Sequence, residues 1–576
     1  MIQVPALMAC RRVVVAALVL LSTAGLGGLL LQVLVPGGWT IAKLAMVAAF
    51  LGTAPWTGLS LANGLIGFAI LMGRQDGVGA KFPAPLELGR GLPRTAIVMT
   101  VRDEDMSGVL PPLRRLLHEL DSFGVGPSFA VFILSDTQDG PAAAAERRAV
   151  AAFRADDRDP TRIRYRRRAR NVGFKAGNIM EFLDHHAAGF ELMLTLDADS
   201  EMSAPAVLRL VRAMEADPAL AIVQHLTVGS PASAAFPRLF QFGMRAGMRV
   251  WATGQAWWQG DEGPYWGHNA AVRIAPFRMH CRLPTLPDGR HVLSHDQLEA
   301  AMLCGAGWRV RVLLDEDGSW EVTPPALPEF LRRELRWLEG NLQYRHLLCL
   351  PGLRAMGRWQ LLQAILLFTG APCYLLFLLA AAVAAGTDAT SPFPIAPALG
   401  LTAAWLAAVY APKLLGYAEI ALSPARREQF GGFARVAVGA VAEFLFALLL
   451  DGVSVVAKTG AMLRLARGAH PNWLPQNRND RGVSWGEAFR RYWPQTLLGV
   501  LALSGFMPAG WIAMLWASAL SAGLLLAIPL GVLTADPRTG RWLREHQIAA
   551  VPEEHPARLP ARAVSAVALQ PQSEAD

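Results

Sequence analysis

The chain has 576 residues, of which 53% are hydrophobic and only 17% are charged, and its formal net charge is +8. Soluble globular proteins carry about a quarter of charged residues, so this composition excludes a purely soluble protein and predicts that part of the chain lies in lipid. The positive excess fits a cytoplasmic face against anionic lipid, and the long apolar segments argue against a basic nucleic-acid binder.

Two apolar runs lie near the start of the chain, at residues 13–35 and 42–72. Each is long enough to cross a membrane, because about 20 helical residues span the roughly 30 Å of hydrocarbon. The first run could instead be a cleaved signal peptide, since residues 7–10 are similar to a lipoprotein cleavage site. The apolar run follows Cys10 rather than preceding it, so we predict a retained anchor.

Residues 94–328 alternate strand-like and helical patterns. Strands are predicted at residues 95–101, 128–136, 161–168, 191–199 and 219–226, and helices at residues 107–123, 141–156, 175–186 and 204–217. This alternation predicts an open parallel sheet with helices on both faces. Such sheets bind ligands beyond the carboxyl ends of their strands.

Aspartates stand at two of these strand ends. Asp136 closes the second strand, and Asp197 and Asp199 close the fourth in the sequence LTLDADS. The two carboxylates of a DxD motif can hold Mg²⁺ or Mn²⁺ against the phosphates of a nucleotide. No GxxxxGKS or GxxxxGKT and no GxGxxG after the first strand offers another way to bind phosphate. A lone DxD can also be a turn or a helix cap, but its place after a buried strand favours the metal.

Two further polar segments follow. Asp296 begins a predicted helix in HVLSHDQLEAA, where it is either an N-cap or the general base for a sugar hydroxyl. Arg333, Arg336 and Trp337 lie together on an amphipathic helix just before an apolar run. Arginine pairs with diphosphates and tryptophan stacks on sugars, but an interfacial helix with snorkelling arginines would show the same pattern.

Aromatic and basic stretches lie between these motifs. Residues 254–274 are rich in Trp and Tyr, which suit carbohydrate rings and equally fill cores. Lys175 stands near a predicted helix start, where it could meet phosphate or a base. The run RIRYRRRAR at 162–170 fits a solvated or lipid-facing edge as well as a binding site.

Apolar runs return after residue 355. Spans are predicted at 361–386 and 394–412, with two more within 496–533, which gives six in all. Residues 434–468 carry charges inside their apolar pattern, namely Glu443, Asp451 and Lys458. Charges are costly at the bilayer centre, so we expect this segment to lie in the interface or to line a protein cavity.

Basic residues are distributed unevenly around the spans. They flank the first two runs and recur at 426–427 and 464–467, whereas the short loops GGWT and GTDATSPF carry no Lys or Arg. The positive-inside rule therefore places both termini and the middle domain in the cytoplasm.

The five cysteines form no CxxC pair, which argues against a disulfide or zinc framework. The segment after Thr534 is rich in Pro, Ala and charge, and we predict it to be disordered.

Taken together, these motifs resemble the processive family 2 glycosyltransferases, which include cellulose and hyaluronan synthases. That family shows an Asp, a DxD, a TED-type aspartate and QxxRW before a membrane helix. The matching residues are Asp136, Asp197, Asp199, Asp296, Arg333, Arg336 and Trp337. The resemblance implies an α/β GT-A (Rossmann-like) cytoplasmic catalytic domain inserted into an α-helical membrane domain, with about six transmembrane helices plus interfacial helices.

Two departures, SHD for TED and Arg333 for Gln, point to a narrower group. The segments VRDED, RRARNVGFKAGNI, LDADS, YWGHNA, LSHD and RWLEGNLQ look like the glucans biosynthesis glucosyltransferase H family of osmoregulated periplasmic glucan synthesis. This resemblance implies UDP-glucose as donor and a linear β-1,2-linked glucan as product. It also implies the bacterial inner membrane as location and periplasmic glucan-modifying proteins as partners. Family members commonly carry longer N- and C-terminal regions.

Carried over position by position, the resemblance assigns roles to named residues. Glu104 and Asp136 would contact the uracil side of UDP, with Lys175 and Asn178 near the nucleotide. Asp197 and Asp199 would bind UDP and the metal, Asp296 would deprotonate the acceptor, and Arg333 and Arg336 would meet the diphosphate. The acceptor sugar would lie against Trp337, with Trp266 and His268 of YWGHNA. A gating loop of the wider family corresponds to residues 472–485, including Trp473 and Gln476, although the motif differs here.

The sequence thus predicts five regions. They are two transmembrane helices at 1–84, the GT-A domain at 85–330, an interfacial RxxRW helix at 331–360, further membrane helices at 361–534 with a cytoplasmic loop at 469–493, and a cytoplasmic tail at 535–576. We expect an inverting single displacement, which needs one base and no enzyme nucleophile. The spans could pass the growing glucan chain across the bilayer or could serve only as anchors.

Three alternatives stay open. An enzyme that transfers one sugar to a lipid phosphate would share Asp136 and the DxD, but should lack the RxxRW helix followed by several spans. A transporter or sugar sensor with a degenerate nucleotide domain is disfavoured by the intact acidic residues and Trp337. A cellulose-like or hyaluronan synthase is disfavoured by the missing Gln and TED.

Overall fold

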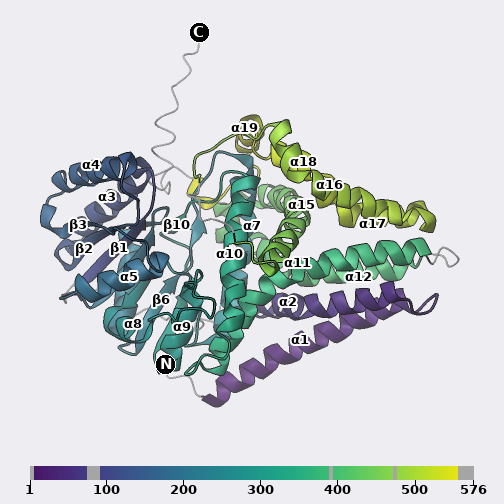
Figure 1. Ribbon diagram of the computed structural model, residues 1–576, viewed down its shortest axis with the longest axis horizontal. Coiled ribbons are helices and arrows are strands. Elements are labelled where there is room, and N and C mark those ends of the chain that lie inside the picture. Colours follow the sequence, from purple (N-terminus) through teal and green to yellow (C-terminus); the bar gives the residue numbers. More distant parts are fainter. Residues whose placement is uncertain (1–4, 74–90, 388–392, 471–476, 555–576) are drawn as a thin grey trace, which may run out of the picture.

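A computed structural model describes residues 5–73, 91–387, 393–470 and 477–554 of the chain. Figure 1 shows strands with their covering helices on the left and a bundle of long helices on the right. Helix α2 (Ile41–Met72) packs against α11 (Ala355–Thr387), which follows the sheet domain in the chain. The sheet domain is therefore inserted between two sets of helices that join in one bundle.

A seven-stranded mixed sheet forms the core of the first part. In spatial order its strands are β3 (Ile163–Arg167), β2 (Phe129–Ser135), β1 (Thr95–Val101), β4 (Leu192–Asp197), β8 (Ala270–Arg273), β6 (Leu220–His225) and β9 (Arg309–Leu313). β8 is antiparallel to both of its neighbours, and the other pairs are parallel. The five predicted strands are confirmed and run in one direction, and the sheet is mixed because β8, which was not predicted, runs against them.

The direction of β8 follows from where the chain returns to the sheet. After β6, helix α7 (Ala235–Gln259) leaves the sheet, and the chain comes back to the carboxyl end of β6. There the backbone N–H of Trp266 donates to Gln224 Oε1 at 2.8 Å, and the N–H of His225 donates to the Asn269 carbonyl at 3.1 Å. A strand that starts at this edge must run against its neighbours.

Helices cover both faces of the sheet, because alternate strand residues point to opposite sides. On one face, α3 (Met106–Ser122), α4 (Pro141–Ala155) and α6 (Ala204–Ala216) pack on residues such as Ile97 and Leu194. On the other, α5 (Phe174–His185), α8 (Ile274–His280) and α9 (Asp296–Gly305) pack on residues such as Val98 and Met193. This double burial explains the nearly continuous apolar runs of the predicted strands.

A second, three-stranded sheet lies beside the first. Its strands are β5 (Glu201–Met202), β10 (Ser319–Glu321) and β7 (Val228–Gly229). These strands are too short for a periodic pattern, so the sequence did not predict them. β10 pairs with the segment that directly follows the DxD, and it therefore brings residues from around position 320 to that motif.

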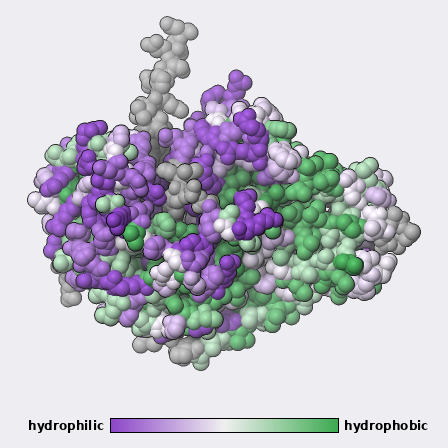
Figure 2. Space-filling view, viewed as in Figure 1, coloured by the Kyte–Doolittle hydropathy of each residue, from purple (hydrophilic) through white to green (hydrophobic). Residues whose placement is uncertain are grey.

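Among the described residues, four helices are long and apolar enough to cross a membrane, and up to six spans result if each of two bent pairs counts as one. The four are α1 (Pro5–Leu34), α2, α11 and α15 (Phe433–Ala466), and the pairs are α12 (Ile395–Val409) with α13 (Ala411–Leu422) and α17 (Trp511–Leu525) with α18 (Ala527–Leu533). Figure 2 shows hydrophobic surface gathered over this part and hydrophilic surface over the sheet domain. The chain is a multi-pass membrane protein.

The six candidate spans of the structure are not the same six segments that the sequence predicted. α15 is one continuous helix that passes as a span by length and composition, although an interfacial or cavity-lining position was expected. Its charges meet protein partners, which offsets their cost in lipid: Glu443 contacts Lys413, Asp451 contacts the Tyr410 hydroxyl, and Lys458 lies 2.9 Å from Glu334. α16 (Trp485–Gly505), which contains the start of a predicted span, does not pass this test.

The expected disorder after Thr534 is wrong for the described part of that segment. α19 (Pro537–Glu545) begins at an Asp536 cap, and the short helix η5 (Pro552–Glu554) lies against α7. Glu553 pairs with Arg245, and Glu554 lies 2.8 Å from Arg238 Nη1. Local composition could not reveal these contacts, because the partners lie 308 and 316 positions away in the sequence.

Two amphipathic helices join the parts of the protein. α7 packs against α2, α13 and α15, and α10 (Leu327–Gln343) packs against α11 and α15. The remaining short helices are α14 (Pro424–Gln429), η1 (Gly126–Ser128), η2 (Pro160–Arg162), η3 (Tyr344–His346) and η4 (Met507–Ala509). α10 carries the RxxRW residues, so these side chains lie between the sheet domain and the membrane helices.

Candidate active site

The carboxyl ends of the parallel strands meet at one edge of the sheet. Glu104 follows β1, Asp136 follows β2, and Asp197 ends β4. The Asp197 amide donates to Ser200 Oγ, and the Ser200 amide donates to the Asp197 carbonyl, each at 3.0 Å. This tight turn holds the DxD at the strand end, while the cap of the following helix is Ser203. The DxD itself is therefore not a helix cap.

Lys175 joins Asp197 to the loop before β8. Its Nζ contacts Asp197 Oδ1 and donates to the Gly267 carbonyl at 2.9 Å. Burial opposes ionisation of Asp197, but Lys175, together with His268 and Arg478, lowers the pKa of this carboxyl to about 2. Asp197 is thus a carboxylate at neutral pH, which is the form that binds a metal.

Asp296 reaches the same place from the start of α9. A Cβ added to Gly267 would lie 3.4 Å from Asp296 Cβ and 3.7 Å from Lys175 Nζ. The predicted base and Lys175, which contacts Asp197, therefore both lie next to Gly267. The capping alternative has no support, because the N-cap of α9 is His295 and it makes no side-chain capping bond.

Arg478 is a site residue that the motif analysis missed. It lies in the segment before α16, and its Nη2 is 3.0 Å from Glu104 Oε1 and 3.8 Å from Asp199 Oδ1. Burial opposes its charge, but Asp199 and Glu104 raise the pKa of Arg478. The stretch NRNDRG was noted as a basic flank and as part of the 472–485 segment that corresponds to a gating loop. Arg478 itself was not assigned to the site, because nothing in its local pattern shows that it folds onto the DxD. Of the proposed gating segment, Trp473 and Gln476 lie outside the described residues.

The predicted diphosphate arginines come from α10. Arg333 is buried, and its Nε has no hydrogen-bond partner among the described residues. Its guanidinium lies 4.6 Å from the Trp337 ring centroid, and Trp337 is 44% exposed. Burial and the charge of Arg333 lower the pKa of Arg336, which Asp199 partly offsets. Two like charges held together in a buried position favour an anion between them.

His268 and Trp266 lie at the carboxyl edge with a further carboxylate, Glu321. His268 Nε2 is 3.6 Å from Glu321 Oε2 at the end of β10. Burial raises the pKa of Glu321, although His268 and Arg333 oppose this. Trp266 is half-buried, and Gln224 holds its backbone. His268 therefore faces the acidic cluster, and Glu321 is a second residue that sequence patterns did not reveal.

Two predicted donor residues are engaged inside the protein. Asp136 accepts from Arg168 Nε at 2.7 Å and from Arg168 Nη2 at 2.9 Å, and both side chains are buried. Asn178 is fully buried, where its Nδ2 donates to the Leu134 carbonyl at 3.3 Å and its Oδ1 accepts from Arg166. Asn178 therefore ties α5, which carries Lys175, to β2, and its place near the nucleotide stays a prediction.

The residues fit a metal that binds together with a diphosphate. Within the described ranges, no group of three or more His, Cys, Asp or Glu side chains is arranged to hold a metal ion. The two DxD carboxylates are partly accessible, with Asp197 33% and Asp199 19% exposed. Mg²⁺ is often held by one or two carboxylates and completes its shell with phosphate oxygens and water. These side chains therefore do not form a complete metal site by themselves.

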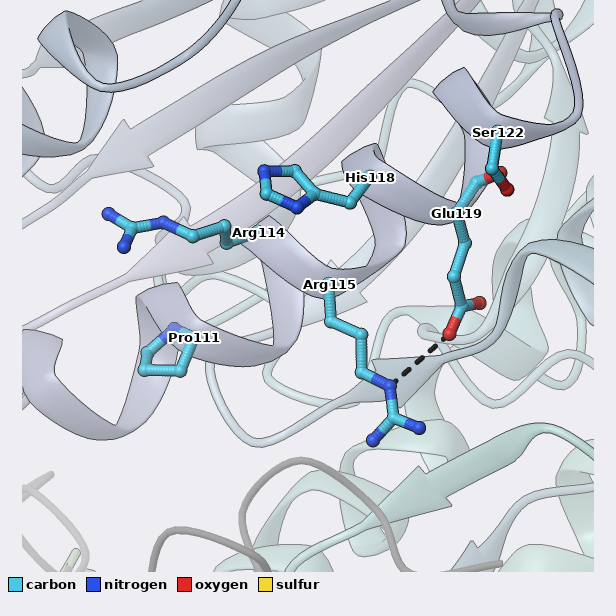
Figure 3. A pocket seen from close by; sticks show the side chains of 6 residues that line it. All are labelled: Pro111, Arg114, Arg115, His118, Glu119 and Ser122. Carbon is cyan, nitrogen blue, oxygen red and sulfur yellow. Dashed lines mark hydrogen bonds and ion pairs between the residues drawn. The ribbon is translucent and has the colours of Figure 1, made fainter. Parts of the chain in front are cut away.

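A hollow on the outer face of α3 lies apart from these residues. Figure 3 shows its lining side chains, Pro111, Arg114, Arg115, His118, Glu119 and Ser122. Arg115 Nε donates to Glu119 Oε1 at 3.2 Å, and the other Glu119 oxygen accepts from the Ala204 amide at 2.9 Å. None of the predicted site residues lines this hollow.

Two sequence profiles of known families match the chain. The profile described as glycosyl transferase family 2 matches residues 97–280, and that described as glycosyl transferase family group 2 matches residues 192–410. Both matches include the DxD, and the second also includes Asp296 and the RxxRW helix. The catalytic domain is therefore of the α/β GT-A type, as the motifs implied.

Curated relatives match nearly the whole chain. A glucans biosynthesis glucosyltransferase H of Rhodopseudomonas palustris is 34% identical over 557 residues, which cover 93% of this chain and 76% of the relative. This chain belongs to that family. Proteins of the same name from Xylella fastidiosa and Vibrio cholerae are 33% and 31% identical, over 91% and 94% of this chain and 85% and 77% of their own. Membership in the family makes the protein a glucosyltransferase and confirms the resemblance drawn from its motifs.

A distant likeness to a solved structure was also found. The mannosyltransferase PcManGT from Pyrobaculum calidifontis, in complex with GDP-Man and Mn²⁺, superposes with a TM-score of 0.40 and 16% identity, covering 73% of this chain and 99% of that one. A superposition of this quality is too weak to transfer the ligands of that complex to this chain.

Proposed function

We propose that the protein polymerises glucose from UDP-glucose into a β-1,2-linked glucan at the bacterial inner membrane, with export to the periplasm, where glucan-modifying proteins would receive it. The observation that carries this proposal is the meeting of Asp296 with the Lys175–Asp197 pair around Gly267, in a chain of the glucosyltransferase family. A base and a donor site that lie close together beside one residue suit a single displacement.

The donor would bind along the carboxyl edge of the sheet. Asp197 and Asp199 would hold Mg²⁺ or Mn²⁺, which when bound neutralises charge on the diphosphate. Arg333 and Arg336 would pair with phosphate oxygens, since the guanidinium fork matches phosphate geometry. Lys175 contacts Asp197 and, like Asp296, lies beside Gly267. We assign Glu104 and Asp136, which follow β1 and β2, to the uracil side.

The reaction is a direct transfer of glucose. Asp296 accepts the proton of an acceptor hydroxyl as that oxygen bonds to C1 of glucose, and the bond between C1 and the diphosphate oxygen breaks. UDP leaves with the electron pair, and its charge is stabilised by Arg333 and Arg336. Attack from the opposite face inverts the configuration at C1. The exposed ring of Trp337 offers a platform for the acceptor sugar, and Trp266 and His268 lie at the same end of the sheet.

A variant of the base tests the chemistry. Purified protein in lipid nanodiscs would receive UDP-glucose and Mg²⁺, and linkage analysis would identify the polymer. Asp296→Asn should keep UDP binding and lose turnover by about 100-fold or more, the contribution of a general base. The exposed Asp288, changed to Asn in the same way, should have no effect. Near-normal turnover of Asp296→Asn would overturn the mechanism, and a lipid-soluble product would indicate transfer to a lipid phosphate instead.

Polar contacts of α15 support the export step. Asp451 lies on the exposed surface of this candidate span and contacts the Tyr410 hydroxyl. An exposed carboxylate is costly against lipid, but not against a water-filled passage. The rings of Tyr374 and Trp405 stack at 5.7 Å, and α11, which carries Tyr374, packs against α15. Aromatic rings beside a carboxylate suit a passing sugar chain.

Sealed inside-out vesicles test export directly. Because the catalytic domain is predicted to face outward there, supplied UDP-glucose should yield glucan that an added glucanase cannot reach until detergent opens the vesicles. Glucan that is degraded fully before detergent is added would argue against export, while leaving the glucosyl transfer intact.

A further inference from the structure

A fully buried glutamine holds the loop that contains Gly267. Gln224 lies near the end of β6. Its Oε1 accepts from the backbone N–H of Trp266 at 2.8 Å, and its Nε2 donates to the His268 carbonyl at 2.9 Å. The same Nε2 donates to the His225 carbonyl, also at 2.9 Å. One side chain therefore joins the residues on both sides of Gly267 to a strand of the main sheet.

A second fully buried amide holds the end of this loop. Asn269 Nδ2 donates to Ser319 Oγ at 2.8 Å and to the Trp320 carbonyl at 3.4 Å. A carbonyl can only accept a hydrogen bond, so this contact fixes which end of the amide is the nitrogen. Asn269 Oδ1 is then the atom that accepts from His268 Nδ1 at 3.3 Å. The side chain of Asn269 thereby joins the imidazole of His268 to β10.

The backbone of Asn269 is fixed as firmly as its side chain. Its φ is +51°, a left-handed conformation that asparagine adopts more readily than most residues. Its N–H donates to the Thr195 carbonyl at 2.7 Å, and its carbonyl accepts from the His225 N–H at 3.1 Å. Thr195 lies in β4, two residues before Asp197. The loop is therefore attached to β4, β6 and β10 together.

The loop borders the groups to which the reaction is assigned. The Gly267 carbonyl accepts from Lys175 Nζ at 2.9 Å. A Cβ added to Gly267 would lie 3.4 Å from Asp296 Cβ. Trp266 and His268, the predicted acceptor contacts, are the direct neighbours of Gly267 in the chain. Movement of the loop would therefore move the acceptor contacts relative to the base.

We propose that Gln224 and Asn269 are positioning residues that fix the Trp266–His268 loop, so that glucose is transferred to a sugar hydroxyl rather than to water. The inference rests on the proposed function, in which Asp296 is the base and this loop borders the acceptor. Both amides act through the loop. A sugar hydroxyl reaches C1 of the donor only when its ring is held in place, whereas water is small and needs no such contact.

The competing reaction is hydrolysis of UDP-glucose. Asp296 accepts a proton from water as the water oxygen bonds to C1, the bond between C1 and the diphosphate oxygen breaks, and UDP leaves with the electron pair. Hydrolysis yields free glucose and UDP, whereas transfer yields a longer glucan and UDP. The ratio of glucan to free glucose therefore reports how well the loop holds an acceptor, and it does not depend on the amount of folded enzyme.

The test is this ratio in purified variants in lipid nanodiscs, supplied with radiolabelled UDP-glucose and Mg²⁺. Gln224→Met keeps the length of the side chain and removes its three hydrogen bonds. Asn269→Gly removes the amide and keeps the left-handed backbone, which glycine adopts freely. Each variant should bind UDP as the wild type does and lower the ratio about 10-fold or more, because a displacement of about 1 Å can cost about 100-fold in the positioned reaction.

Gln255→Met provides the matched control. Gln255 is a buried glutamine on α7, and its Oε1 accepts from Trp251 Nε1 at 3.0 Å. Its replacement also removes a buried hydrogen bond, so it should lower stability in thermal unfolding, but the ratio should stay at the wild-type value. A fall in the ratio of the same size in Gln255→Met would overturn the inference, because the effect would then follow from lost stability alone.

A role in structural support alone predicts a different result. Glucan and free glucose would then fall together, and the ratio would not change. A wild-type ratio in folded Gln224→Met or in folded Asn269→Gly would overturn the positioning role, and if one variant does not fold, the other decides. If Asp296→Asn is inactive while these ratios stay at the wild-type value, only this inference fails. If Asp296→Asn retains turnover, the proposed function fails with it.

Discussion

Gly267 is the residue around which the base, the lysine and the DxD meet, and alanine at this position tests that geometry. The backbone of Gly267 has φ +85°, and a Cβ placed on it would lie 3.4 Å from Asp296 Cβ and 3.7 Å from Lys175 Nζ. These are contact distances rather than clashes, so the fold should persist. The left-handed backbone would cost roughly 1–2 kcal/mol of stability for an L-residue, and the methyl group would fill the space between base and lysine.

Gly124 provides the matched control. It has φ +72°, and a Cβ there would meet nothing within 4 Å. Gly124→Ala should therefore lose similar stability and keep its turnover. Gly267→Ala should lose turnover by about 10-fold to 100-fold, because small displacements of reacting groups have effects of this size. UDP release from UDP-glucose measures the rate, and thermal unfolding measures stability. Equal turnover of the two variants at equal stability would refute the placement of the reaction beside Gly267.

Three further substitutions probe the donor site, the acceptor platform and the C-terminal contact. Arg478→Gln should raise the KM for UDP-glucose about 10-fold, since hydrogen bonds to charged groups contribute about 1.5–3 kcal/mol; an unchanged KM in steady-state assays would remove Arg478 from the donor site. Trp337→Ala should shorten the glucan measured by gel filtration, whereas Trp337→Phe keeps a ring and should preserve its length; equal lengths in all three proteins would contradict stacking. Glu553→Ala should lower the unfolding free energy by about 3–5 kcal/mol, because it leaves the buried Arg245 unpaired. The double variant Glu553→Met with Arg245→Met should recover most of this loss in detergent unfolding, and a fully stable Glu553→Ala would show that the C-terminal segment contributes little.

Local patterns were sufficient for five strands of the seven-stranded sheet, for the helices between them and for most of the acidic motif. The runs of β1, β2 and β4 are buried on both faces, so their apolar character is continuous and easy to recognise. The DxD follows directly from the end of such a strand. Asp296 could be found because it begins a helix in a segment similar to a known family motif. The long apolar helices could be found because lipid imposes a length and a composition on any span.

Only the tertiary structure shows which residues from distant parts of the sequence lie close together. Arg478 and Glu321 reach the DxD from later segments. The resemblance placed Arg478 in a gating segment, but neither local sequence carries a signal for contact with the DxD. The charges of α15 looked incompatible with a span until partners such as Lys413 and Tyr410 were placed beside them. The C-terminal segment looked disordered until α7 supplied Arg238 and Arg245. The periodicity of strands and helices depends on neighbouring residues, so the sequence by itself determines it. Ion pairs between distant segments depend on proximity in three dimensions, so only the fold determines them.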